Sequence, residues 1–189
     1  MLNIKDFEKE FYGKPVPSEL AKLLEFQNKF GEETYSECFS LSYYKDRFKE
    51  LETWSDSAEF VNSIYPFARA NGSGSFYALW DNKKGSELSD VPVVIFGDEG
   101  GIFIVARNLL GFLQILAFGP EPSVDPESGV TLYKGDDFEP QENAAAYVEW
   151  LKETFKIEKI QDPESIIREA QNECQQLFTD WSSKLLKKY

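Results

Sequence analysis

The chain has 189 residues, and its 33 acidic and 20 basic side chains give a formal net charge of −13. It contains no histidine and two cysteines, which excludes a Ser-His-Asp or Cys-His catalytic arrangement, a zinc site with histidine ligands and a four-cysteine zinc site. The negative charge argues against binding to a nucleic-acid backbone and favours a basic protein partner. This length suits one domain with a substantial buried core.

No segment of the sequence is typical of export or of a membrane anchor. The N-terminal segment alternates in charge and lacks the basic flank and apolar run of a signal peptide. The longest nearly uncharged apolar stretch, residues 108–120, is too short to cross a bilayer as a helix. We therefore expect a cytoplasmic protein in which Cys38 and Cys174 are reduced, buried and structural.

Apolar residues at helical spacing predict helices at both ends of the chain and in its middle. Ser18 is expected to cap the second helix, and Asn108 to cap an apolar and therefore buried helix. Asp162 precedes a proline and is expected to cap the last helix, whose apolar stripe includes Cys174 and Leu177. The predicted helical segments are residues 3–12, 18–31, 47–64 (one or two short helices), 108–118, 143–155 and 162–185.

Strands are predicted between these helices, where short apolar and aromatic runs are bounded by turn residues. Residues 91–96 are almost wholly apolar, as expected of a central strand covered on both faces. The loop 97–101 contains three glycines and lies between two apolar runs, which predicts a hairpin. The predicted strands are residues 37–44, 75–80, 91–96, 102–105 and 130–133.

The negative charge is concentrated in one part of the chain. Residues 111–145 contain seven acidic residues and one lysine, a net charge of −6, whereas residues 146–189 are nearly neutral. The acidic segment lacks the spacing of a calcium-binding EF-hand. It is either a solvated loop or a docking surface for a basic protein. The candidate partner-binding residues are Asp98, Glu99, Glu121, Asp125, Glu127, Asp136, Asp137 and Glu139.

Three other features have both a structural and a functional interpretation. Asp98 and Glu99 could serve as an acid and a base, but adjacent residues at a hairpin tip usually point apart, which favours turn formation or a partner contact. The glycine-rich residues 71–75 lack the lysine of a phosphate-binding loop and lead into a strand, which predicts a turn. The aromatic clusters in 76–80 and 147–155 could stack bases or sugars, but their spacing favours the core.

Three segments follow one another in the middle of the chain. Residues 67–80 are FARANGSGSFYALW, residues 91–101 are VPVVIFGDEGG, and residues 105–110 are VARNLL, preceded by a proline-then-helix entry at residues 16–20. In order and spacing these segments resemble the SUKH superfamily, the Smi/Knr-like group. That group includes a fungal regulator of glucan synthesis and many bacterial immunity proteins. The resemblance covers about residues 16–122.

The resemblance implies an α+β fold in a single domain over residues 1–189. A twisted, largely antiparallel central sheet would be flanked by helices, with a core at about 16–122 and a C-terminal helical part at about 143–189. It carries no catalytic motif, so we expect no enzyme activity, no cofactor and no metal. The implied function is that of an immunity protein, which neutralises a cognate bacterial toxin, such as a basic nuclease, by stoichiometric, non-covalent binding.

Two other hypotheses stay open. The protein could be a non-catalytic regulatory or scaffold module that binds an endogenous partner through the same fold. It could also be an enzyme that uses carboxylates alone, such as a glycosidase, although only its content of acidic and aromatic residues points that way. The first of the three hypotheses predicts a basic protein partner and no interaction with nucleic acid or membrane.

Overall fold

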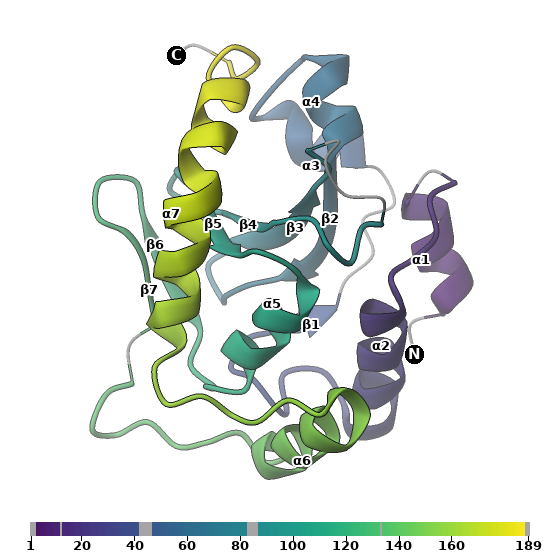
Figure 1. The fold of residues 1–189 in the computed structure, drawn as a ribbon, viewed down its shortest axis with the longest axis vertical. Helices are drawn as coiled ribbons and strands as arrows, with labels where there is room; N and C mark the ends of the chain where they lie inside the picture. Colours follow the sequence, from purple (N-terminus) through teal and green to yellow (C-terminus); the bar gives the residue numbers. More distant parts are fainter. Residues whose placement is uncertain (1–2, 12, 42–46, 83–86, 133, 188–189) are drawn as a thin grey trace.

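A five-stranded antiparallel sheet forms the centre of the molecule (Figure 1). The computed structural model describes residues 3–11, 13–41, 47–82, 87–132 and 134–187. The sheet strands lie in chain order: β1 (Ser40–Leu41), β2 (Ile64–Arg69), β3 (Phe76–Trp80), β4 (Val93–Phe96) and β5 (Ile102–Ala106). A separate antiparallel hairpin consists of β6 (Pro122–Asp125) and β7 (Gly129–Leu132). The predicted α+β class with a largely antiparallel sheet is confirmed.

Helices cover both faces of the central sheet. They are α1 (Ile4–Glu10), α2 (Ser18–Phe30), α3 (Arg47–Glu52), α4 (Ala58–Ser63), α5 (Leu109–Leu116), α6 (Ala144–Phe155) and α7 (Pro163–Ser182). In Figure 1, α7 runs beside β5, and α1 and α2 lie on the other side of the molecule. Within the described part of the chain, no helix is both long enough and apolar enough to cross a membrane.

The sheet is buried on both faces because its side chains alternate into two apolar cores. Phe76 and Trp80 of β3 point into one core, which also receives residues of α3, α4 and α7. Tyr77 and Leu79 point into the other core, which α1, α2, α5 and α6 cover. A strand buried on both faces needs no polar side, which explains the apolar run at 91–96. Residues outside 16–122 complete both cores: Phe7, Phe11, Ala170 and Phe178.

The outer edge of β5 is covered by glutamine side chains of α7. Gln175 Oε1 accepts a hydrogen bond from the backbone N–H of Ile104 (2.8 Å), and Gln175 Nε2 donates to the carbonyl of Ile102 (3.4 Å). Gln171 Nε2 donates to the carbonyl of Ile104 (3.2 Å). An uncovered edge strand presents unpaired backbone groups to other chains. Helix α7 therefore closes this edge as well as covering one face.

The predicted helix starts are confirmed at two positions and wrong at a third. Asn108 Oδ1 accepts a hydrogen bond from the backbone N–H of Gly111 (2.9 Å), and Asp162 Oδ1 accepts one from Ser165 (3.2 Å). Ser18 does not cap α2; it is the first helical residue, and Pro17 stands before it without a side-chain cap. The reason is that the fixed φ of Pro17, −53°, already sets the direction of entry into the helix.

The strand predictions need two corrections. Of the strand expected over residues 37–44, only β1 is found; Cys38 precedes it with φ +53°, and residues 42–44 lie outside the described residues. Strands β2 and β6 were not predicted. In β2 the residues are apolar on both faces and follow directly on α4, so no alternation marks the change from helix to strand.

Several predictions of burial are also wrong. Leu177 is 47% exposed, and its neighbour Phe178 is the buried residue of that turn of α7. Cys38 and Cys174 are half-buried free thiols. The aromatic cluster of α6 packs in the core as predicted: Tyr147 is buried, and the half-buried Trp150 and Phe155 pack against the same core. The cluster at residues 76–80 is buried, as predicted.

Candidate functional site

The glycine-rich turn at residues 71–75 is organised by the buried side chain of Asn71. Asn71 Oδ1 accepts hydrogen bonds from the backbone N–H groups of Gly74 (3.1 Å) and Ser75 (2.9 Å). Asn71 Nδ2 donates to Ser75 Oγ (3.0 Å) and to the carbonyl of Pro122 in β6 (3.2 Å). Asparagine side chains commonly stabilise turns in this way. The predicted turn is present, and Asn71 fixes it to the β6–β7 hairpin.

Asp98 holds the same turn from the β4–β5 connection. Its Oδ1 accepts a hydrogen bond from Ser75 Oγ (2.7 Å) and lies 2.9 Å from Ser73 Oγ, and its backbone N–H donates to Ser75 Oγ (3.1 Å). The hydrogen bond from Ser75, followed by that from Ser73, lowers the pKa of Asp98 below its ordinary value. Asp98 is therefore an ionised anchor. By contrast, the neighbouring carboxylate of Glu99 has no hydrogen bond or ion pair with any described residue.

Glu121 lies on the other side of the same turn. Its Oε2 accepts a hydrogen bond from the backbone N–H of Gly72 (2.8 Å). Burial, together with the neighbouring carboxylate of Glu121, raises the pKa of the Cys38 thiol to about 11. Since only a thiolate is a strong nucleophile, this thiol is unreactive at neutral pH.

Asp125 stabilises the turn between β6 and β7. Its Oδ1 accepts hydrogen bonds from the backbone N–H groups of Ser128 (2.7 Å) and Glu127 (2.9 Å) and from Ser128 Oγ (2.8 Å). These bonds, the backbone one from Ser128 first, lower the pKa of Asp125. The side chain is fully exposed. Its charge is therefore held in one place and directed to solvent.

The β6–β7 turn lies against the β4–β5 connection. A Cβ atom placed on Gly97 would lie 2.7 Å from Val124 Cγ1, and one placed on Gly100 would lie 3.5 Å from Pro126 Cγ. Turns that are far apart in the sequence therefore share one edge of the molecule. Five of the eight predicted partner-binding residues lie there. We call them the acidic edge: Asp98, Glu99, Glu121, Asp125 and Glu127.

The other three predicted residues, Asp136, Asp137 and Glu139, follow β7 in an exposed segment that we call the acidic flank. This segment is held by Phe138, since a Cβ atom on Gly119 would lie 3.0 Å from Phe138 Cζ. Lys134 Nζ lies 4.8 Å from the centroid of the Phe138 ring. The structure therefore brings five of the predicted residues together and places the remaining three beyond the open end of the hairpin.

None of these eight carboxylates pairs with a lysine or arginine among the described residues. All nine ion pairs found among those residues use other acidic residues, such as Glu33, Asp81 and Glu173. Unpaired, exposed charges of one sign produce a local negative potential. Among the same residues, no group of three or more Cys, Asp or Glu side chains could hold a metal ion.

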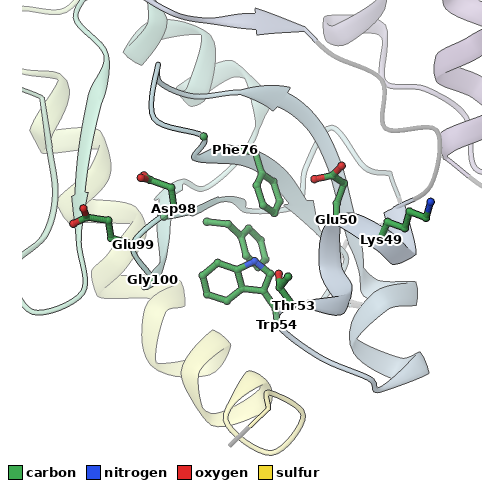
Figure 2. Close-up of a pocket in the computed structure, with 11 residues that line it drawn as sticks. Lys49, Glu50, Thr53, Trp54, Phe76, Asp98, Glu99 and Gly100 are labelled. Atoms are coloured by element: carbon green, nitrogen blue, oxygen red, sulfur yellow. The ribbon is translucent and has the colours of Figure 1, made fainter. Parts of the chain in front are cut away.

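Beside the acidic edge is a pocket of about 520 Å³, which we call the aromatic pocket (Figure 2). Its inner wall is aromatic: the Phe76 and Phe96 rings are stacked with centroids 4.7 Å apart, and Trp54 meets Phe96 edge-on at 5.1 Å. Trp54 is held in place because the backbone N–H of Lys187 donates to its carbonyl (2.9 Å). The rim is formed by α3, the turn 71–75 and the β4–β5 connection.

Acidic residues stand on two sides of the aromatic pocket. In Figure 2, Asp98 and Glu99 lie on one side of the rings, Glu50 lies on the other, and Lys49 points away from the rings. The volume is in the range of small-molecule sites, roughly 300–1,000 Å³. The pocket therefore combines an apolar wall with a negatively charged rim.

Comparison with known protein families, with curated proteins and with solved structures finds no match for the chain.

The sequence did not point to the aromatic pocket. The sequence predicts that the aromatic residues 76–80 lie in the core and that residues 47–64, which include Trp54, are helical. Neither residue type marks a site by itself. Phe76 and Phe96 are directly paired residues of the neighbouring strands β3 and β4, so their side chains lie on the same face of the sheet. An aromatic residue in each of the two predicted strands was the one signal available. The contribution of α3 and of the loop after it could not be inferred, because it depends on how that helix packs on the sheet.

Proposed function

We propose that this protein is an immunity protein that binds a cognate basic toxin one to one and neutralises it without a covalent bond, in the cytoplasm. The observation that carries the proposal is the acidic edge, where five carboxylates of adjoining segments lie along one edge of the molecule and none is paired with a described base. The resemblance of residues 16–122 to the SUKH superfamily supports the same function. Toxins that act on nucleic acids need a basic surface, which such an edge can cover.

The geometry of the edge supports fast and selective association. Asp98 and Asp125 each accept hydrogen bonds from their turns, so their charges are fixed before a partner arrives. Charges arranged in this way raise the association rate with a partner of opposite sign and disfavour partners of the same sign. The effect is screened within about 8–10 Å at physiological salt, so the association rate should fall as salt is added.

We propose no role for Asp98 as a general acid. A general acid in a carboxylate-based hydrolase needs a raised pKa. The hydrogen bond from Ser75 lowers the pKa of Asp98 instead, which leaves no proton to donate at neutral pH. Incubation with a panel of glycosides should give no turnover, and turnover that is abolished in Asp98→Asn would favour the glycosidase hypothesis.

Capture of the partner tests the proposal. Tagged protein is used for a pull-down from the native cell at about 50 mM salt, where charge contacts are weakly screened, and the retained proteins are identified by mass spectrometry. We expect one stoichiometric basic polypeptide that survives a wash at high salt. Many weak partners lost in that wash, or a set of endogenous regulatory proteins, would favour the scaffold hypothesis.

Two matched variants then show which acidic group binds. Glu99→Gln with Glu127→Gln removes two charges from the acidic edge, and Asp136→Asn with Asp137→Asn removes two from the acidic flank. None of these four side chains accepts a hydrogen bond from a described residue, so the fold should be retained. We expect the edge variant to slow association with the captured partner several-fold more than the flank variant at low salt. Equal effects would argue against docking at the edge.

A further inference from the structure

We propose that the aromatic pocket receives an arginine side chain of the basic partner. This inference rests on the proposed function for the existence of a basic partner, and it assigns the pocket beside the acidic edge to one specific contact. The pocket, bounded by Trp54, Phe76 and the 97–100 turn, would hold the guanidinium group, while the acidic edge contacts the protein surface around it.

The aromatic wall is suited to a guanidinium group. A planar cation is attracted to the face of an aromatic ring, and tryptophan gives the strongest such interaction. Phe96 is fully buried and Phe76 is 8% exposed, so both act as a rigid support. Trp54 is only half-buried, which leaves part of its ring for contact with a ligand. The hydrogen bond from Lys187 fixes the backbone of Trp54 and the edge-on contact with Phe96 supports its ring, so little conformational freedom is lost on binding.

The rim is suited to the charge of the group. Oδ1 of Asp98 is occupied by serine hydroxyls, whereas Oδ2 accepts no hydrogen bond from a described residue. The carboxylate of Glu99, next to it, is unpaired within the same part of the chain. A carboxylate can bind a guanidinium group through two parallel hydrogen bonds. Glu50 adds negative charge on the opposite side of the rings (Figure 2).

Other occupants fit this combination less well. A phosphate or another anion would meet an acidic rim. A neutral apolar group would use the rings but leave the carboxylate of Glu99 without a partner among the described residues. Lysine offers a point charge with strong hydration, whereas arginine combines a flat, weakly hydrated face with several donors at its edge. The pocket offers rings and carboxylates together, which is the arrangement that the arginine side chain matches.

The test uses the full-length protein labelled with ¹⁵N and three small probes: Nα-acetyl-arginine amide, Nα-acetyl-lysine amide and Nα-acetyl-citrulline amide. Citrulline has the shape of arginine but no charge. We expect the arginine probe to move the Trp54 indole N–H signal and the backbone signals of Glu99 and Gly100 in a saturable manner at low salt. The lysine probe should bind more weakly, and the citrulline probe should leave these signals in place. Trp150, which is half-buried in the other core, is the internal reference.

Variants connect the signals to the pocket. Trp54→Leu and Glu99→Gln should each raise the dissociation constant of the arginine probe by about two- to fivefold, the range expected for one exposed cation–π or charge contact. Asp136→Asn removes the same charge from the acidic flank and should leave that constant unchanged. Glu99→Gln keeps the proposal testable if Trp54→Leu fails to fold, because the side chain of Glu99 contacts no described residue through a hydrogen bond or ion pair.

Three outcomes would overturn the inference. They are equal shifts with citrulline, equal binding of lysine, and the same loss in Glu99→Gln and Asp136→Asn. The proposed function is tested separately by the pull-down and by the salt dependence of association. A partner that depends on the acidic edge without arginine binding in the pocket would leave the proposed function intact and remove only this contact.

Discussion

Two carboxylates of the acidic edge stabilise the fold before they can bind anything. Asp98 joins the β4–β5 connection to the turn 71–75, and Asp125 closes the β6–β7 turn. Nothing in the sequence distinguishes these two aspartates from other surface aspartates. In the structure the pKa of each is lowered, because neighbouring hydrogen-bond donors favour the ionised form. The acidic edge therefore contains residues with a structural role and residues, Glu99 and Glu127, that are available to a partner.

The pH dependence of stability should reveal the role of Asp98. Because the folded pKa of Asp98 lies below the unfolded value, its contribution to the free energy of unfolding is present above the unfolded pKa and lost as the pH falls through the folded pKa. We expect Asp98→Asn to be less stable than the wild type at pH 7, with a smaller difference at pH 3. Urea unfolding at the two pH values measures this.

Glu99→Gln is the matched control, since it removes the same charge one residue away without breaking a hydrogen bond. It should change the free energy of unfolding little at either pH. If Asp98→Asn and Glu99→Gln behave alike, or if the difference for Asp98→Asn is the same at pH 3 and pH 7, the anchor role of Asp98 is wrong.

Replacing glycine by alanine should change the free energy of unfolding in opposite directions at two positions. At Gly97 a Cβ atom would lie 2.3 Å from the carbonyl oxygen of Gly100, so Gly97→Ala should lower the free energy of unfolding by about 1–3 kcal/mol. At Gly111, inside α5, the nearest atoms would lie at 3.5 Å, so Gly111→Ala should raise it by up to about 1 kcal/mol. Thermal unfolding of both variants checks the prediction, and destabilisation by both would contradict it.

Helix α7 is the element that completes the sheet. It covers one face with Ala170 and Phe178 and hydrogen-bonds the outer edge of β5 through Gln171 and Gln175. The sequence predicted this helix and its N-cap but gave a stripe that included Leu177. The neighbouring residues Leu177 and Phe178 are both apolar, so periodicity alone does not decide which one faces the core. Packing against Trp80 decides it, with ring centroids 5.0 Å from Phe178.

The hydrogen bonds from the glutamines of α7 to β5 should make a measurable contribution to the free energy of unfolding. Gln175→Ala leaves the backbone N–H of Ile104 without its partner, which should lower the free energy of unfolding by about 1–3 kcal/mol. Gln176→Ala is the matched control on the same helix. Among the described residues, the side chain of Gln176 donates a hydrogen bond only to Asp180 at the surface, so its loss should cost less than about 0.5 kcal/mol. Denaturant unfolding compares them, and equal values would argue against closure of the β5 edge by α7.

The distribution of charge is a property of the whole molecule. The lysines and arginines that form ion pairs in the described residues do so with acidic residues outside the edge and flank. Eight carboxylates that pair with no described lysine or arginine therefore lie around the β6–β7 hairpin and the turn beside it. Such an arrangement favours association with a basic partner but opposes the compact state through self-repulsion.

Salt should therefore stabilise the free protein. With a net charge of −13, raising sodium chloride from about 0.05 to 0.5 M should raise the free energy of unfolding, because screening reduces repulsion in the folded state. A variant with Asp136→Asn, Asp137→Asn and Glu139→Gln should gain less from the same change. An equal gain would show that repulsion at the flank contributes little. Urea unfolding at both salt concentrations provides the comparison.

The sequence by itself determined the local features of this protein. The caps at Asn108 and Asp162, the hairpin at residues 97–101 and the apolar central strand follow from residues a few positions apart. Local hydrogen bonds and turn preferences set such features, so a short window of sequence contains the information. The α+β class was expected from the resemblance of residues 16–122 to a known superfamily, and the net charge set the sign of the expected partner.

Only the tertiary structure decided how these parts combine. Asp98 bonds to Ser75 across 23 residues of chain, and Gln175 bonds to Ile104 across 71. Which acidic residues meet, which of them are anchored and which face of α7 is buried all depend on packing of the whole sheet. The aromatic pocket depends on it most, because Trp54, Phe76 and Phe96 come from separate elements. Contacts of this kind are stabilised by the burial of apolar surface. This effect is non-directional and favours contact between any apolar residues, so the sequence alone does not show which of them will meet.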